Sequence, residues 1–199
     1  MLPDRARAMA HRLEETAERL GVPPQGRRLI TTAFELAMRP RVERLPDDHH
    51  PDFLHPGRTA LILMEDAGIA DATVIAAGTL CESLRLELAV CSTEIENAVG
   101  DDVRRLVRGV PLPAEAGDLL LEELVAADPA VQAIALAERL DHARHLHLRP
   151  ETEWAEAHAL TCEVYRPVAS RVHPTFARRY RWWCGMFAER YLGSRPAEP

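Results

Sequence analysis

Apolar residues recur along most of the chain at intervals of three and four positions. Met9, Leu13 and Leu20 follow this spacing, and the turn formers of residues 21–24 come directly after them. Because side chains at this spacing share one face of an α-helix, the pattern predicts an amphipathic first helix. No alternation of the strand type extends beyond a few residues. The sequence therefore predicts an all-α protein, a compact bundle of about eight to ten helices.

Proline and polar residues mark where the helices of the first half are expected to begin and end. A second helix should stop at Arg39, because the residue before a proline avoids the helical conformation, and residues 41–56 should form a polar loop. Residues 72–89 are apolar almost all round, as in a central buried helix, and Asp71 is placed to cap them.

Capping signals predict the helices of the second half. Thr93 and Glu96 form the pattern of a capping box, and Asp128-Pro129 marks the start of a helix that reaches about residue 148. Two more helices are expected over residues 151–171 and 174–191. In the last one, aromatic residues at helical spacing predict packing in a core or a protein interface: Phe176, Tyr180, Trp183 and Phe187.

Charge and cysteine content narrow the setting of the protein. The 199 residues carry a formal net charge of −7, and an acidic domain repels phosphate backbones, so nucleic-acid binding is not expected. No apolar run approaches the roughly 18 residues of a membrane span, and the first residues lack the apolar core of a secretion signal. No C-x-x-C pair occurs among Cys81, Cys91, Cys162 and Cys184. We expect a cytoplasmic protein with reduced thiols and no membrane partner.

A series of short motifs runs through the chain in a fixed order. They occupy residues 33–37, 53–56, 59–63, 73–80, 95–103, 106–110, 136–140 and 163–169. Together they resemble the HD-domain hydrolase module of the RelA/SpoT family, whose members hydrolyse the guanosine polyphosphate ppGpp. The resemblance covers roughly residues 28–172. It implies an HD-like domain over 28–172, preceded by an N-terminal helix in 1–27 and followed by a C-terminal helix and frayed tail in 173–199, all within one structural domain.

The resemblance also implies a metal site built from two histidines and two aspartates, and this sequence departs from it. His55, in the motif Phe53-Leu54-His55-Pro56, keeps the first ligand. Cys81 and Glu82 stand where the family has a His-Asp pair, and Glu138 stands for the final aspartate. The four candidate ligands are therefore His55, Cys81, Glu82 and Glu138.

The acidic pair that handles the attacking water in the family is replaced by Arg85 and Leu86. No catalytic residue is therefore assigned in the sequence. Three interpretations follow. A divalent metal persists, with a thiolate shifting the preference from Mn²⁺ towards Zn²⁺. Alternatively, the metal is lost, and Arg85, on the same helical face as Cys81 and Glu82, pairs with Glu82 and Glu138. In the third interpretation, Cys81 is a small buried residue and Glu82 forms a solvated pair with Arg85.

His142 and Arg144, which follow Glu138 in the sequence, are candidates for ligand contact. His142 and Arg144 lie near the place where the family contacts its substrate, and the alternative is that they line a helix end, where positive charge is favourable. With Arg85 they form the predicted ligand-binding set.

The sequence thus supports three functional hypotheses. The favoured one is a catalytically degenerate HD-domain protein that binds a guanosine-type nucleotide or a partner protein as a regulatory module. The second is an active, atypical metal-dependent phosphohydrolase of the ppGpp hydrolase type. The third is a helical scaffold without a small ligand, a homo-oligomer that associates through the helix carrying Trp182 and Trp183.

Overall fold

The computed structural model describes residues 2–45, 47–84, 88–113 and 119–193, and every regular element in them is helical. The all-α prediction is confirmed. The first half contains α1 (Asp4–Arg19), α2 (Pro24–Arg44), α3 (His55–Leu61), the π-helical turn η1 (Ile62–Asp66), α4 (Ala72–Leu80), the 3-10 turn η2 (Cys81–Leu84), α5 (Ser92–Val99) and α6 (Asp101–Gly109). The second half contains α8 (Leu120–Ala126), α9 (Pro129–His145), η5 (Leu146–Leu148), η6 (Glu151–Glu153), α10 (Trp154–Leu160), η7 (Thr161–Tyr165), α11 (Arg166–Val172) and α12 (Pro174–Tyr191).

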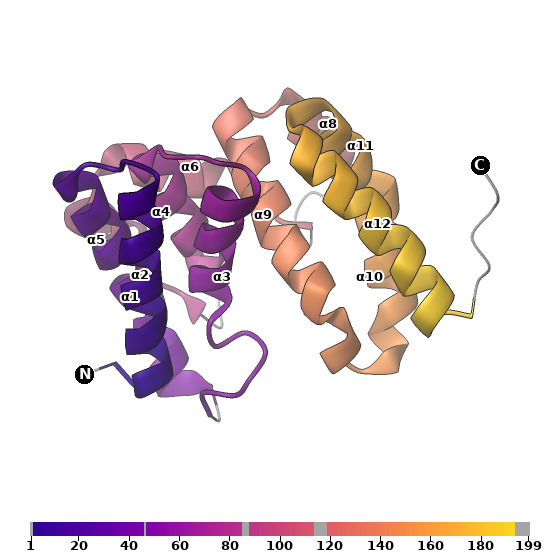
Figure 1. Cartoon of the computed structure of the whole chain (residues 1–199), viewed down its shortest axis with the longest axis horizontal. Helices are drawn as coiled ribbons and strands as arrows, with labels where there is room; N and C mark the ends of the chain where they lie inside the picture. The colour runs from indigo at the N-terminus through magenta and orange to yellow at the C-terminus, as the bar shows by residue number, and fades with distance from the viewer. Residues whose placement is uncertain (1, 46, 85–87, 114–118, 194–199) are drawn as a thin grey trace.

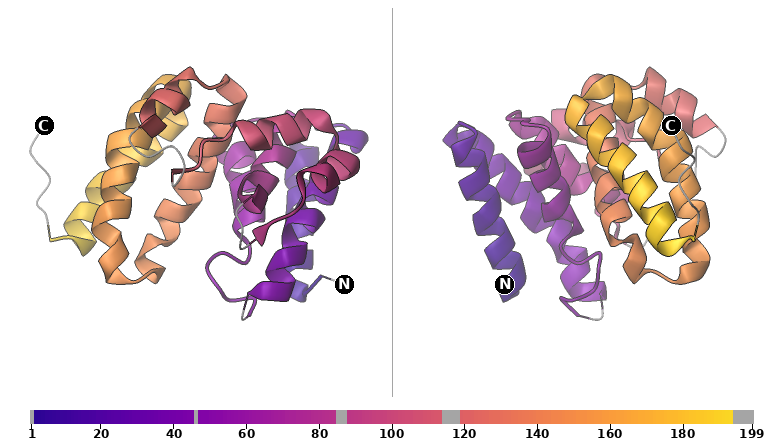
Figure 2. Two further views of the ribbon diagram at one scale, coloured as in Figure 1. Left: turned by 180° about the vertical axis from the view of Figure 1, so that it is seen from behind. Right: turned by 45° about the vertical axis from the view of Figure 1, so that its right-hand side comes forward.

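Helix α9 lies between two groups of helices (Figure 1). On one side it contacts α3, α4 and α6, and on the other it contacts α11, α12 and η7. Figure 2 shows from behind that α1–α6 form one group and α10–α12 the other. Side chains on α9 are therefore placed where the two groups meet.

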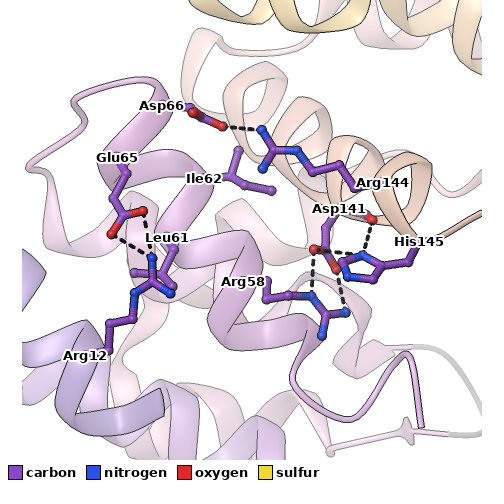
Figure 3. Close-up of a pocket in the computed structure, with 9 residues that line it drawn as sticks. All are labelled: Arg12, Arg58, Leu61, Ile62, Glu65, Asp66, Asp141, Arg144 and His145. Atoms are coloured by element: carbon purple, nitrogen blue, oxygen red, sulfur yellow. Dashed lines mark hydrogen bonds and ion pairs between the residues drawn. The ribbon is translucent and has the colours of Figure 1, made fainter. Parts of the chain in front are cut away.

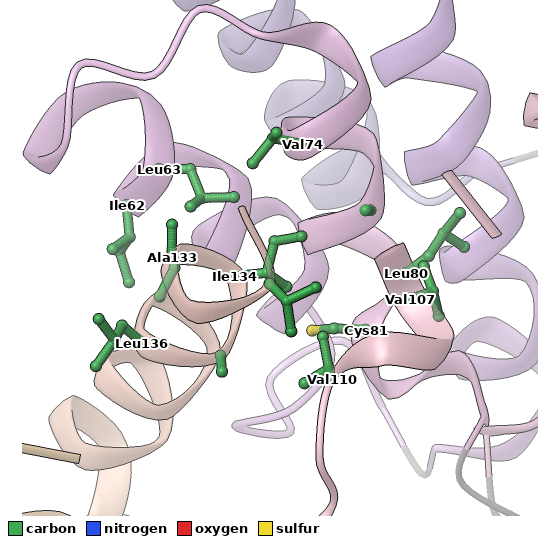
Figure 4. Close-up of a cluster of buried hydrophobic side chains, with 14 of the residues drawn as sticks. Ile62, Leu63, Val74, Leu80, Cys81, Val107, Val110, Ala133, Ile134 and Leu136 are labelled. Carbon is green, nitrogen blue, oxygen red and sulfur yellow. The ribbon is translucent and has the colours of Figure 1, made fainter. Parts of the chain in front are cut away.

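The largest apolar cluster is built around α4 and α9 (Figure 4). Leu80 of α4 and Ile134 and Leu136 of α9 are fully buried there. Gly78 allows α4 to approach η1 closely, since a Cβ atom at this position would lie 2.4 Å from Cδ1 of Leu63. A larger residue at Gly78 would require the side chain of Leu63 to move.

Two of the predicted capping signals are confirmed, and one is wrong. Asp71 accepts hydrogen bonds from the backbone N–H groups that start α4, and Asp128 accepts one at the start of α9. The capping box is wrong, because α5 begins after Cys91 without a side-chain capping bond. The helix predicted over 72–89 is α-helical only to Leu80 and continues as η2.

The predicted end of the second helix is also wrong. Helix α2 continues through Pro40 to Arg44. A proline inside a helix lacks the N–H for the bond to the preceding turn, which destabilises the helix locally. The next residue offsets this cost, because the side chain of Arg41 bonds to the carbonyl oxygens of Ala37 and Asp52.

The aromatic face of α12 packs in the core, as predicted. Phe176, Tyr180, Trp183 and Phe187 are each at most 2% exposed. The expectation of reduced thiols is wrong for two of the four cysteines, because Cys162 of η7 and Cys184 of α12 form a disulfide. Their spacing of 22 residues gave no local signal of this pairing. Within the described ranges, none of the helices has the length and hydropathy required to cross a membrane.

Candidate metal centre

Three elements position the charged residues at the junction of α9 with the first group of helices. His55 is the first residue of α3, followed by Pro56, which suits the first turn because it needs no N–H partner there. Glu82 lies in η2, directly after the buried helix α4. Glu138 and His142 lie on α9 and share one face, since they are four residues apart.

These four side chains form one group. One ligand atom of each of His55, Glu82, Glu138 and His142 lies within 4.8 Å of those of the other three. His142 Nε2 is 2.8 Å from Glu82 Oε1 and 3.1 Å from Glu138 Oε1. His55 Nε2 is 3.4 Å from Glu82 Oε2, and the two imidazole rings stack with their centroids 4.5 Å apart. We call this group the His–Glu centre.

A carboxylate outside the centre fixes the orientation of His55. His55 Nδ1 donates a hydrogen bond of 2.7 Å to Asp141 Oδ2, because an ionised carboxylate can only accept. Arg58 holds the same carboxylate with two hydrogen bonds of 2.8 and 2.9 Å. The Nε2 atom of His55 therefore faces the His–Glu centre. Metal-binding histidines are oriented in this way by a second carboxylate.

A buried arginine holds one carboxylate of the centre. Arg41 Nη2 donates to Glu82 Oε2 at 2.8 Å, and the two side chains are only 1% and 4% exposed. Burial lowers the pKa of Arg41, and the charge of Glu82 opposes this change. Arginine stays protonated in proteins, so the pair is a buried ion pair.

The pKa values of two groups in and beside the centre are displaced from their usual range. Burial alone would lower the pKa of His142, but Glu138 and Glu82 outweigh it and raise this pKa to about 10. Burial would raise the pKa of Asp141, but His55 and Arg58 hold it far below its usual value. In the metal-free protein, a proton on His142 thus balances part of the negative charge of the two glutamates.

Three of the four predicted ligands lie in the centre: His55, Glu82 and Glu138. The fourth position is taken by His142, which the sequence had indicated only as a ligand contact. Cys81 is 3% exposed, lies in the apolar cluster and donates a hydrogen bond through Sγ to the Gly78 carbonyl. Burial of Cys81 fits the third interpretation, but the solvated state of Glu82 assumed there is wrong, since Glu82 is 4% exposed.

Other predicted residues lie elsewhere. Arg85 and Leu86 fall outside the described residues. Arg144 pairs with Asp66 at 2.7 Å. Sequence reasoning missed Arg41, because Pro40 placed it in a loop, and it missed Asp141, although its position three residues after Glu138 on one helical face was a usable signal.

Two of the cavities beside α9 are lined by arginines. Figure 3 shows the larger, of about 210 Å³, which Arg12, Arg58, Asp141, Arg144 and His145 help to line. Its charged groups pair with one another across the opening, including Arg12 with Glu65 and Arg144 with Asp66. The smaller cavity has a volume of about 170 Å³. It is lined by His142, Arg139 and Arg149, and also by Leu146, Glu153 and Ala157. His142 is the residue that this cavity shares with the His–Glu centre.

The donor atoms suit a divalent metal. Two imidazole nitrogens and two carboxylates are ligands that Zn²⁺ and Mn²⁺ both accept, and the centre is largely buried. The hydrogen bond of His55 to Asp141 and that of Glu82 to Arg41 are the supporting contacts that ligands of this kind have in metal sites. Fold and centre together define an all-helical protein with a histidine–carboxylate site that could hold a metal ion.

Comparison with known proteins places the chain in a family. No family model matches it. The chain is 30% identical over 134 residues to the human guanosine-3′,5′-bis(diphosphate) 3′-pyrophosphohydrolase MESH1. The matched region covers 64% of this chain and 74% of the human protein. The chain belongs to the guanosine-3′,5′-bis(diphosphate) 3′-pyrophosphohydrolase family, in agreement with the resemblance seen in its motifs.

Two larger relatives agree. A guanosine-3′,5′-bis(diphosphate) 3′-pyrophosphohydrolase of Aquifex aeolicus is 30% identical over 169 residues, or 80% of this chain. A probable GTP pyrophosphokinase of Mycobacterium leprae is 30% identical over 151 residues, or 72% of this chain. The chain spans only 24% and 19% of the length of these two proteins.

Proposed function

We propose that the chain is a metal-dependent phosphohydrolase that binds a guanosine-type polyphosphate, with His142 serving as a metal ligand in place of the histidine replaced by Cys81. One observation carries the proposal. His55 Nε2, oriented through the bond of Nδ1 to Asp141, faces two carboxylates and a second imidazole within 4.8 Å. This restores the two-histidine, two-carboxylate set that the family resemblance implies.

The residues of the chain would share the work as follows. His55, Glu82, Glu138 and His142 would hold the ion, after His142 has lost its proton. A bound divalent cation supplies polarisation of a phosphoryl oxygen and activation of water. Arg139 and Arg149, which line the smaller cavity, would bind the polyphosphate, because guanidinium groups pair well with phosphate oxygens. Arg149 would exchange its pairing with Asp52 for the phosphate.

A second candidate function rests on separate observations. The acidic pair of the family is replaced by Arg85 and Leu86, and Arg41 already neutralises Glu82 within the buried centre. Loss of general acid–base groups typically costs a factor of roughly 10² to 10⁴ in rate. A catalytically degenerate protein that binds a guanosine-type nucleotide or a partner protein, without turnover, fits these features.

Metal content tests the first function. Elemental analysis of the purified protein should give about one divalent ion per chain, and a His142→Gln variant should lose it. His11→Gln is the matched control, since His11 is an exposed histidine of α1 that lies outside the centre. A metal-free wild type that takes up neither Mn²⁺ nor Zn²⁺ in calorimetry would exclude the first function.

Turnover then tests the chemistry. Release of pyrophosphate from guanosine-3′,5′-bis(diphosphate) should occur with Mn²⁺ or Zn²⁺ and vanish in His55→Gln. An Arg149→Ala variant should raise KM, whereas Arg178→Ala, an exposed arginine on α12, should leave it unchanged. Metal binding and nucleotide binding without turnover above the His55→Gln background would establish the degenerate function instead.

A further inference from the structure

A second group of potential metal ligands lies in the C-terminal helices. His158 of α10 and Cys162 of η7 are four residues apart in one helical run, and Cys184 approaches them from α12. His158 Nε2 is 3.4 Å from Cys162 Sγ and 2.9 Å from the Cys184 carbonyl oxygen. The imidazole nitrogen and the two sulfur atoms lie within 4.8 Å of one another.

The surroundings fix the imidazole beside the sulfur atoms. The ring of His158 contacts those of Trp183 and Phe187, with centroids 5.6 and 5.9 Å apart. Cys162 and Cys184 belong to the same apolar cluster and are 9% and 4% exposed. His158 is only half-buried, so the group has an opening to solvent on its side. None of these residues belongs to the His–Glu centre.

We propose that reduction of the disulfide turns this group into a zinc site with the ligands Cys162 Sγ, Cys184 Sγ and His158 Nε2. A dithiol reductant transfers two electrons and two protons to the S–S bond, becomes a disulfide itself and leaves two thiols. Zn²⁺ then displaces both thiol protons, and the imidazole proton moves to Nδ1. Water completes the coordination on the open side of His158. This proposal does not depend on the function proposed above.

Chemistry and distances favour zinc over other physiological divalent ions. Two thiolates and one imidazole form a soft ligand set that Zn²⁺ prefers. With Zn–S bonds of about 2.3 Å, two thiolates in a tetrahedral site lie about 3.8 Å apart. The Cα atoms of Cys162 and Cys184 are 6.0 Å apart. After reduction, rotation of the two side chains can therefore bring the sulfur atoms to this separation.

Cobalt provides a direct probe, because a cobalt–thiolate bond has a charge-transfer absorption in the near ultraviolet. The protein reduced with a dithiol and then separated from it without oxygen should bind Co²⁺ at this group with that absorption and with the visible bands of a tetrahedral site. Added Zn²⁺ should abolish both. The His–Glu centre contains no sulfur ligand and cannot give the charge-transfer band. The oxidised protein should not give it either.

Three variants assign the ligands, and a fourth is the control. Cys162→Ser and Cys184→Ser should lose the band. His158→Gln should weaken Co²⁺ binding by more than the roughly 10–100-fold typical of losing a supporting contact to a ligand. Cys91→Ser is the control, because Cys91 is an exposed free cysteine, and it should behave as the wild type. Circular dichroism confirms that each variant is folded. A reduced wild type without the band, or a band that persists in Cys162→Ser, would overturn the proposal.

Discussion

Replacing Arg41 by methionine should destabilise the protein strongly. Methionine keeps much of the apolar stem of arginine but removes the guanidinium that contacts the buried carboxylate of Glu82, while the contact of Glu82 with His142 remains. Breaking a buried ion pair from one side costs about 3–5 kcal/mol in the free energy of unfolding. For a chain of this length that corresponds to a fall in Tm of roughly 6–20 °C.

Urea unfolding followed by circular dichroism measures this loss of stability. Arg39, two residues before Arg41, provides a matched control. Arg39 lies on the same helix and pairs with Glu94, but the two side chains are 49% and 38% exposed. Arg39→Met should therefore cost less than about 1 kcal/mol. Adding Glu82→Met to Arg41→Met should recover at least half of the loss, because the buried carboxylate that lost the guanidinium is then removed as well. If Arg41→Met cost no more than Arg39→Met, the buried ion pair would not have the role described here.

Three further predictions concern the metal-free protein in a chelator. The pKa of His142 is raised from 6.5 to about 10, so the stability that His142 contributes is complete below pH 6.5 and lost as the pH rises to 10. The urea midpoints of the wild type and of His142→Gln should therefore converge between pH 6.5 and 10. The pKa of Asp141 is lowered by His55 and Arg58, so its contribution is present above pH 3.8 and lost on acidification; Asp141→Asn should be destabilised at pH 7 and should approach the wild type in acid. Tyr180→Phe removes a buried hydrogen bond of 2.6 Å to a carbonyl of α9 and should lower the free energy of unfolding by about 1–3 kcal/mol.

Much of the fold was predictable because hydrophobic spacing directly reflects burial. The aromatic residues of α12 and the capping aspartates of α4 and α9 are local signals, and the structure confirms them. The end of α2 was not predictable in this way. The local preference against a proline in a helix is outweighed by the contacts of Arg41 with Asp52 and Glu82. Both partners lie outside α2, so a local pattern does not report them.

The candidate site was predictable only as far as the motifs carried it. His55, Glu82 and Glu138 occupy family positions, and the structure brings them together. The place of His142 depends on the rotation of α9 relative to η2, which no motif encodes. The disulfide of Cys162 with Cys184 likewise depends on how α12 packs against η7, and residue spacing along the chain does not report it.

The position of α9 between the two groups of helices restricts how its length can vary in evolution. Each residue inserted into a helix turns everything beyond it by about 100°. An insertion between Ala135 and Glu138 would rotate Glu138 and His142 away from Glu82 and would at the same time misalign the surfaces that hold α11 and α12. Length changes in this protein should therefore accumulate in the connections between helices, while α9 keeps a constant number of residues among its descendants.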